Sequence, residues 1–231
     1  MTAPNAIWTN EMTFPTSSSR RRFIVSAGVT TASFIFSGAA WAQTRKERIA
    51  EHEAYAKMYG AMPDERFPIP AVDLSKIDPV YLRRFGEYET AEPAGTVIVD
   101  TAKRVLFLTL PDGKAIRYGI GIGREGFAWS GRALINHKKA WPTWTPPSEM
   151  IDRQPELEEW RKGMPPGLEN PLGARALYIY QDGRDTLYRL HGTGQPETIG
   201  KAVSSGCVRL LHQDVIDLYN RVPDHTPIVV L

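Results

Sequence analysis

The chain has 231 residues, with 28 lysines and arginines, 26 aspartates and glutamates and a formal net charge of +2 at pH 7. A charge so close to balance argues against nucleic acid or an anionic membrane surface as the main partner. The sequence holds a single cysteine, which excludes an internal disulfide, and its length suits one domain with an extension.

Residues 1–42 have the pattern of a twin-arginine export signal. The arginines at 20–22 precede a weakly apolar stretch, residues 23–36, which is too short and polar for a membrane anchor of about 20 apolar residues. The Ala-Trp-Ala of residues 40–42 is an A-x-A cleavage site, so we expect a mature chain that begins at Gln43. Removing residues 1–42 takes away three arginines and one glutamate and leaves 25 basic and 25 acidic residues. We therefore expect a formally neutral periplasmic protein with no stable membrane span after cleavage.

Residues 43–93 form a charged extension. The segment 45–59 is rich in charged residues and alanine and looks helical, whereas the prolines at 63, 68, 70 and 79 predict coil beyond it. We expect this irregular and partly helical extension to act as a tether and a packing arm.

Residues 94–231 are expected to form one mostly β domain with short helices. The expected strands are residues 96–100, 104–110, 115–123, 133–140, 175–180, 186–191 and 227–231. A helix near the C-terminus is predicted from the spacing of Leu211, Val215, Leu218 and Val222. The long polar segment 148–171, with a possible helix at 156–161, is interpreted as a lid or binding loop.

Three glycines, Gly119, Gly121 and Gly123, alternate with apolar residues in the third expected strand. Alternation places them on one face, where another backbone can pack closely. A nucleotide-binding loop is excluded because the glycine spacing is wrong and no helical pattern follows at once.

The single cysteine, Cys207, lies in Ser-Ser-Gly-Cys-Val-Arg, sixteen residues after His191. A free thiol has a pKa of about 8.5, so a nucleophilic cysteine needs a base, and His191 at the end of an expected strand can supply it. Because the glycine at 206 allows a tight turn, the amides of Gly206 and Cys207 could form an oxyanion hole. The alternative is a small buried hydrophobic residue. The expected export favours a catalytic cysteine over a buried hydrophobic one, since a lone thiol without a chemical role is unusual in an oxidising compartment.

Five segments in one order resemble the bacterial L,D-transpeptidase family, the YkuD domain of ErfK/YbiS type. The segments are residues 95–100, 118–126, 141–147, 170–177 and the pair His191-Gly192-Thr193 with Ser204-Ser205-Gly206-Cys207-Val208-Arg209. The resemblance implies a β-sandwich-like catalytic domain and a cysteine acyl-enzyme. The implied donor is a peptidoglycan tetrapeptide stem, cleaved between diaminopimelate and the terminal D-alanine. Transfer to a diaminopimelate amine on a neighbouring stem would give a 3→3 cross-link.

The resemblance also implies roles for individual residues. Cys207 matches the nucleophile, His191 the base, and Gly192 the residue whose carbonyl fixes the imidazole tautomer. Arg209 matches an arginine that could pair the carboxylate of the substrate in a bidentate fork, with a structural salt bridge as the alternative. Ser205 stands where many relatives have histidine, which leaves His191 as the base candidate. Its hydroxyl could donate to the thiolate or be satisfied by the backbone of the turn.

Other candidates are weaker. Trp144 and Trp141 could line the cleft or belong to the core. His212, at the start of the last helix, is interpreted as a surface residue of the cap region. No metal and no cofactor are expected, because the remaining histidines lack metal-ligand spacing and one cysteine excludes a cysteine-rich zinc site.

Four functions remain open at this point. The first is the cross-linking transferase, and the second attaches an outer-membrane protein to peptidoglycan with a different amine. The third, with water as acceptor, is an L,D-carboxypeptidase or a hydrolase that releases such attachments. The fourth is a non-catalytic peptidoglycan-binding module, which the pair of His191 and Cys207 disfavours. In each case the expected partners are peptidoglycan stem peptides.

Overall fold

The computed structural model describes residues 37–123, 130–204 and 206–231, and its contacts divide them at Gly60 into two units. The first unit holds α1, Ser37–Met58, which confirms the helix expected over 45–59. This helix runs through the expected cleavage site at residue 42, whereas the arginines at 20–22 lie outside the described residues. Within the described part of the chain, no helix is long and apolar enough to cross a membrane.

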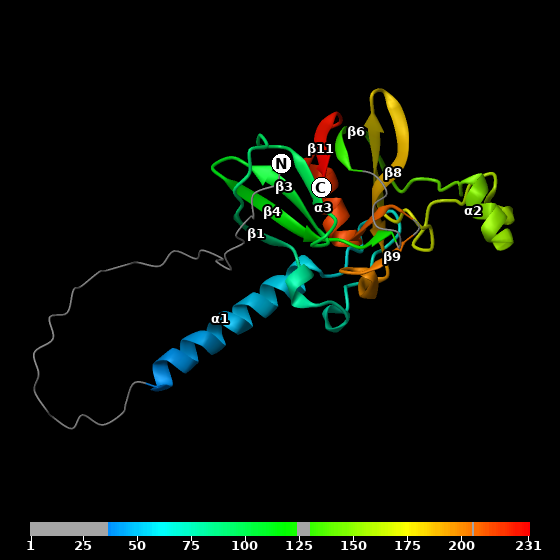
Figure 1. The fold of residues 1–231 in the computed structure, drawn as a ribbon. Helices are drawn as coiled ribbons and strands as arrows, with labels where there is room; N and C mark the ends of the chain where they lie inside the picture. Colours follow the sequence, from blue (N-terminus) through cyan, green and yellow to red (C-terminus); the bar gives the residue numbers. More distant parts are fainter. Residues whose placement is uncertain (1–36, 124–129, 205) are drawn as a thin grey trace, which may run out of the picture. The chain divides into compact units, whose positions relative to one another are not determined.

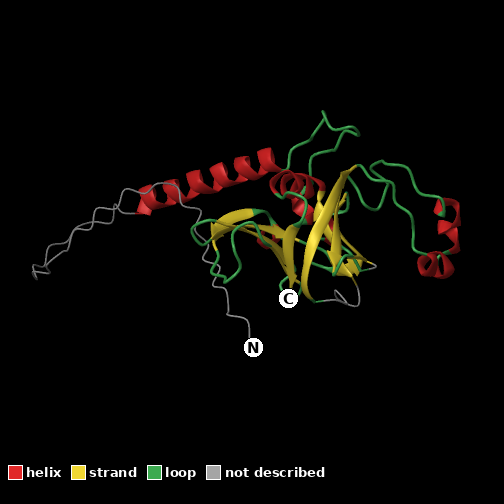
Figure 2. Ribbon diagram, turned by 90° about the horizontal axis from the view of Figure 1, so that it is seen from above, coloured by secondary structure: helices red, strands yellow, loops and turns green. Residues whose placement is uncertain are grey.

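Residues 61–231 are mostly β, with a curled sheet and few short helices, as expected (Figures 1 and 2). The main sheet has nine strands in the order β1-β4-β3-β2-β11-β6-β7-β8-β10, and β5 pairs with β9. The strands are β1 Arg84–Glu87, β2 Val97–Asp100, β3 Val105–Leu110, β4 Lys114–Gly119, β5 Ile122–Gly123, β6 Gly131–Ala140, β7 Arg175–Gln181, β8 Arg184–Thr193, β9 Ala202–Ser204, β10 Val208–Leu211 and β11 Thr226–Val230. The helices here are α2 Ser148–Arg153 and α3 His212–Arg221, with short 3-10 turns η1 Leu74–Lys76, η2 Pro79–Tyr81, η3 Pro155–Trp160 and η4 Pro196–Thr198.

Each expected strand is present, the one expected at 115–123 is divided into β4 and β5, and three further strands appear. β9 and β10 have three and four residues, too few for a period-2 pattern to show. β1 lies inside the expected extension and pairs antiparallel with β4 along the edge of the sheet. The proline-spaced stretch thus contributes sheet as well as coil.

The polar segment after β6 is more helical than expected. The short helix expected at 156–161 is the 3-10 helix η3, which has Pro155 in its first turn, where its missing N–H costs nothing. The α-helix α2 just before it was missed, because a helix of six residues is too short to show an apolar stripe. Figure 2 shows both helices at the end of long loops.

Buried ion pairs pin the extension to the domain, and one of them joins Glu65 to Arg175. Glu65 accepts hydrogen bonds from Arg175 at 2.6 and 3.0 Å and from the indole nitrogen of Trp141 at 2.8 Å. The side chains of Glu65 and Arg175 are only 16% and 11% exposed, so removing either partner would leave an unpaired buried charge and destabilise the fold. Trp141 is therefore a core residue with a satisfied polar tip, and not a cleft-lining one.

The alternating glycines allow close backbone packing, as expected. A Cβ at Gly119 would overlap the carbonyl of Tyr81, and one at Gly121 would lie 2.6 Å from the carbonyl oxygen of Thr198. Gly121 also exchanges backbone hydrogen bonds of 2.8 and 2.9 Å with Arg209 in β10. These contacts hold β10 in place at its outer edge.

The strands that carry the chemistry lie at one end of the sheet. β10 pairs parallel with β8, with Arg209 opposite His191 and Val208 opposite Leu190. Val208 and Leu190 are fully buried on one face, so their neighbours in sequence point to the other face. α3 follows β10 without a loop and packs on β7, β8 and β10, with Val215 and Leu218 buried as their spacing predicted.

Candidate active site

The thiol sits where β10 begins. Gly206, which precedes it, has a φ of 137°, a conformation that residues with a Cβ rarely adopt. The turn therefore needs glycine, and it delivers a half-buried Cys207, which forms no disulfide, to the start of β10. Ser205, the other expected site residue in this turn, lies outside the described residues.

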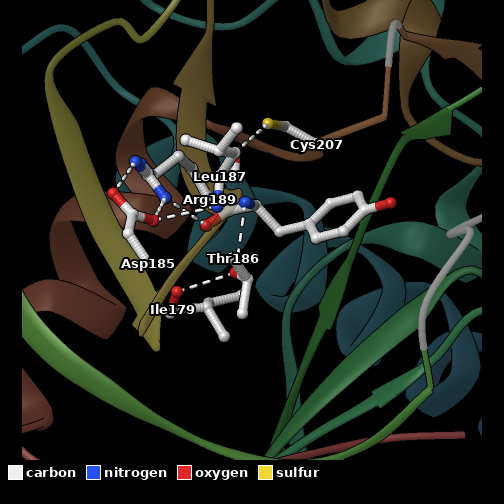
Figure 3. A network of polar contacts seen from close by, with 7 residues as sticks. Ile179, Asp185, Thr186, Leu187, Arg189 and Cys207 are labelled. Atoms are coloured by element: carbon white, nitrogen blue, oxygen red, sulfur yellow. Dashed lines mark hydrogen bonds and ion pairs between the residues drawn. The ribbon is translucent and has the colours of Figure 1, made fainter. Parts of the chain in front are cut away.

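The sulfur of Cys207 lies against the edge of β8 (Figure 3). Its S–H is directed at the carbonyl oxygen of Leu187 at 3.9 Å. Pairing of β10 with β8 begins at Val208 and Leu190, so the backbone groups of β8 before Leu190 have no partner strand in β10. The side chain of Cys207 lies against this unpaired part of the strand. The thiol thus lies against the main chain of the neighbouring strand.

A bulge in β8 creates that edge. The register between β7 and β8 shifts between Tyr178 and Tyr180, and Leu187 has a φ of 63°, which is rare for a branched side chain. Asp185 stabilises the turn by accepting a hydrogen bond of 2.9 Å from the backbone amide of Leu187. Thr186 donates to the carbonyl of Ile179 at 2.7 Å across the strands (Figure 3). Such local strain is typical of functional sites.

His191 is buried in β8, only 5% exposed, and Nδ1 of its ring lies 3.0 Å from the carbonyl oxygen of Gly192. An N–H at Nδ1 can donate to that oxygen, which leaves the lone pair of a neutral ring on Nε2. Burial lowers the pKa of His191 to about 4, although the hydrogen bond to Gly192 opposes this shift. The imidazole is therefore neutral at pH 7, in the state that a base requires.

His191 and Cys207 come from neighbouring strands, and their recorded contacts are with backbone groups. Nδ1 of the ring lies against the carbonyl of Gly192, and the thiol lies against the carbonyl of Leu187. Burial raises the pKa of Cys207, and the charge of Arg209 is among the influences that oppose it, so the resting thiol is protonated.

Arg209 shares the sheet face of His191. It lies opposite His191 in the register of β10 and β8, and its Nη1 donates to the side-chain oxygen of Gln195 at 3.2 Å. Among the described residues Arg209 has no salt bridge, and its hydrogen-bond partner is a neutral amide. Its expected role, pairing the carboxylate of the substrate, stays a prediction.

Trp144 lies apart from this cluster in its recorded contacts. Its backbone pairs with Met164 in the segment that carries α2 and η3, with hydrogen bonds of 2.7 and 3.1 Å. The indole is partly exposed. Its expected role in substrate binding therefore stays a prediction.

The expectation of a surface position for His212 is wrong. His212 is 4% exposed, and its Nδ1 accepts a hydrogen bond of 3.4 Å from the backbone amide of Ala174. The imidazole fills a slot lined by Gly173, Gly192 and Gly194, where added Cβ atoms would meet the ring. Burial lowers its pKa to about 4, and the charge of Arg175 adds to the shift. Helical spacing could not reveal this, because the slot is built from loops and strands distant in sequence.

Arg189 and Asp185 were not predicted as parts of the site. Arg189 lies two residues before His191 in β8, a spacing that puts both side chains on one face of a strand. That alternation was a usable signal for Arg189. The bulge that brings Asp185 back to Arg189 was not visible in the sequence, and neither was the pairing of β8 with β10.

Comparison with known proteins identifies the family of this chain. The family model of the L,D-transpeptidase catalytic domain, YkuD, matches residues 94–230. The probable L,D-transpeptidase YbiS of Escherichia coli K12 is 37% identical over 134 residues, which are 56% of this chain and 42% of that protein. The probable L,D-transpeptidase ErfK/SrfK of the same strain is 33% identical over 141 residues, 58% of this chain and 43% of that protein. This chain therefore matches less than half the length of these relatives.

A solved structure from Brucella melitensis, described as a probable carnitine operon oxidoreductase, is 42% identical over 69% of this chain and 99% of its own. Its TM-score is 0.48. A solved L,D-transpeptidase from Mycobacterium smegmatis is 19% identical, with a TM-score of 0.42 over 59% of this chain and 58% of its own. Neither structural score is high enough to argue for an activity.

Proposed function

This chain belongs to the YkuD family of L,D-transpeptidase catalytic domains, and we propose that it rearranges peptidoglycan stem peptides through an acyl-enzyme on Cys207. The observation that carries the proposal is the placement of the thiol beside the strand of a buried, neutral His191. Nδ1 of that histidine is tied to the carbonyl of Gly192, so Nε2 is the nitrogen that takes a proton. A binding module has no need for this arrangement.

In the proposed reaction His191 takes the proton of Cys207 as the sulfur attacks the amide between diaminopimelate and the terminal D-alanine. The C–S bond forms, the amide C–N bond breaks, and D-alanine leaves with the proton from His191. An amine of diaminopimelate on a neighbouring stem then attacks the thioester and frees the thiol. The product is a 3→3 cross-link.

Two further groups fit this scheme. The amides of Gly206 and Cys207 lie in the turn beside the sulfur and would receive the negative charge that develops on the carbonyl oxygen. Arg209, whose partner is the neutral amide of Gln195, would pair the free carboxylate of the donor peptide. No cofactor or metal is part of the proposal.

We also propose that the protein acts in the periplasm after twin-arginine export. The arginines at 20–22 and the Ala-Trp-Ala of residues 40–42 support this. Peptidoglycan is the substrate that an exported enzyme of this family would meet.

The test is incubation of the purified chain with a disaccharide tetrapeptide, followed by mass spectrometry. A dimer that lacks one D-alanine identifies a transpeptidase, whereas a tripeptide product without dimer identifies a carboxypeptidase. Cys207→Ala is the control, because a thiol-to-methyl change disturbs packing little. Unchanged substrate with folded wild-type protein would contradict the proposal, as would turnover by folded Cys207→Ala.

A carbapenem offers a second test. Its strained ring resembles the acyl donor, so we expect one adduct per chain on the wild type and none on Cys207→Ala by intact-mass analysis.

A further inference from the structure

We infer that Arg189 positions the thiol of Cys207 and favours its thiolate, and that Asp185 holds Arg189 in place while limiting the effect of its charge. The inference rests on Cys207 as the nucleophile of the proposed function. It adds a positioning pair on the strand beside the thiol, which acts through charge and main-chain geometry.

Arg189 is fixed on several sides. Its guanidinium donates to both carboxylate oxygens of Asp185, at 2.6 and 2.7 Å, and to the carbonyl of Tyr188 at 2.8 Å. It also lies over the ring of Tyr178, 4.4 Å from the ring centroid, and the side chain is only 12% exposed. A bidentate fork stacked on an aromatic ring has little freedom to move.

Arg189 and Cys207 lie beside each other across the pairing of β8 with β10, because each directly precedes a member of the pair Leu190 and Val208. Leu190 and Val208 are buried on one face of the sheet, so the side chains of Arg189 and Cys207 share the other face. The backbone amide and the guanidinium charge of Arg189 both act to lower the pKa of the thiol. Both favour the thiolate over the thiol, because each places positive charge near the developing negative charge. Together they lower the pKa of a thiol that burial otherwise raises.

Asp185 acts in the opposite direction to Arg189, because its negative charge disfavours the thiolate. Its carboxylate neutralises part of the charge of Arg189, and it also accepts the backbone amide of Leu187, which keeps the bulge in shape. Among the described residues, the other charged group that acts on the thiol is Arg209 from β10, and the neutral His191 lies on the neighbouring strand β8. Removing Asp185's charge therefore leaves Arg189 free to act more strongly, provided that the bulge survives.

Alkylation of the thiol by iodoacetamide tests this without any peptide substrate. The chain has a single cysteine, so each adduct reports on Cys207 alone. The rate is followed against pH for the full chain and for Arg189→Gln, Asp185→Asn and Arg184→Gln. Asparagine at 185 retains an oxygen for the amide of Leu187. Arg184 lies on the same strand but is exposed, so its variant is the matched control.

We expect Arg189→Gln to slow alkylation at pH 7 by about tenfold, which corresponds to a rise of one unit in the thiol pKa. Asp185→Asn should speed it, and Arg184→Gln should leave it unchanged. A purely structural role for the pair would lower the melting temperature in both variants and shift the two pH profiles in the same direction or not at all.

The inference is overturned if folded Arg189→Gln has the wild-type pH profile, or if Asp185→Asn slows alkylation. Should Arg189→Gln not fold, Arg189→Lys decides together with Asp185→Asn. Lysine keeps the charge but lacks the fork, so Arg189→Lys should keep the wild-type thiol pKa even though its melting temperature falls. If these alkylation results contradict the inference, the proposed transpeptidase function is unaffected, because it is tested separately by the products formed from a peptide substrate.

Discussion

Gly192→Ala should weaken both the fold and the site, because the added methyl group has no room. A Cβ at this position would lie 2.6 Å from Nδ1 of His212, 3.1 Å from a methyl of Val215 and 3.2 Å from the backbone nitrogen of Ala174. The ring cannot retreat freely, because Gly173 closes its slot on another side. The backbone conformation itself is open to alanine, so the effect is one of packing.

Overpacking of a closed core typically costs about 1–3 kcal/mol. For a chain of this size each kcal/mol lowers the melting temperature by about 2–4 °C, so we expect a loss of roughly 2–12 °C. The same shift moves the carbonyl that orients His191, so acylation of Cys207 by a carbapenem should also slow.

Thermal unfolding by circular dichroism measures the first effect and intact-mass kinetics the second. Gly167→Ala is the matched control, since a Cβ there meets nothing within 4 Å. In a His212→Ala background the cost of Gly192→Ala should shrink, because the clashing ring is gone. A melting temperature for Gly192→Ala within 1 °C of wild type would refute the glycine-slot reasoning, as would an equal cost in both backgrounds.

Further expectations concern the base, pH, substrate binding and export. His191→Ala should slow acylation by roughly 10²–10⁴-fold in intact-mass kinetics, and a wild-type rate would point to another base. Burial lowers the pKa of His191 and His212 from 6.5 to about 4, so the unfolded state takes up protons first as pH falls. Stability from this source is complete above about pH 6.5 and is lost towards pH 4, and a melting temperature that stays constant across that window would contradict it. Arg209→Ala should slow acylation or raise KM more than it lowers the melting temperature, with poor rescue by lysine; a large melting shift with normal acylation would make it a scaffold residue. A folded reporter fused to residues 1–42 should lose export when Arg20 and Arg21 become lysine, and unchanged export would exclude the twin-arginine pathway.

Local patterns predicted much of this protein. The alternation of apolar residues marked the strands of the domain, and the spacing from Leu211 to Val222 marked α3, because both record which side of an element is buried. The order of segments around His191 and Cys207 was enough to indicate the family and the expected nucleophile and base. Each of these signals is contained in a short run of consecutive residues or in the order of such runs, so none of them depends on how the strands are arranged.

Pairing between distant segments decided the rest. Parallel alignment of β10 with β8 is what brings the sulfur of Cys207 to Leu187 and Arg189, and a bulge in β8 is what returns Asp185 to Arg189. The slot for His212 needs glycines from separate segments, so a residue that looks like a surface cap in the sequence becomes buried. Register and packing are set by the free energy of the whole sheet and core, and for that reason only the tertiary structure revealed them.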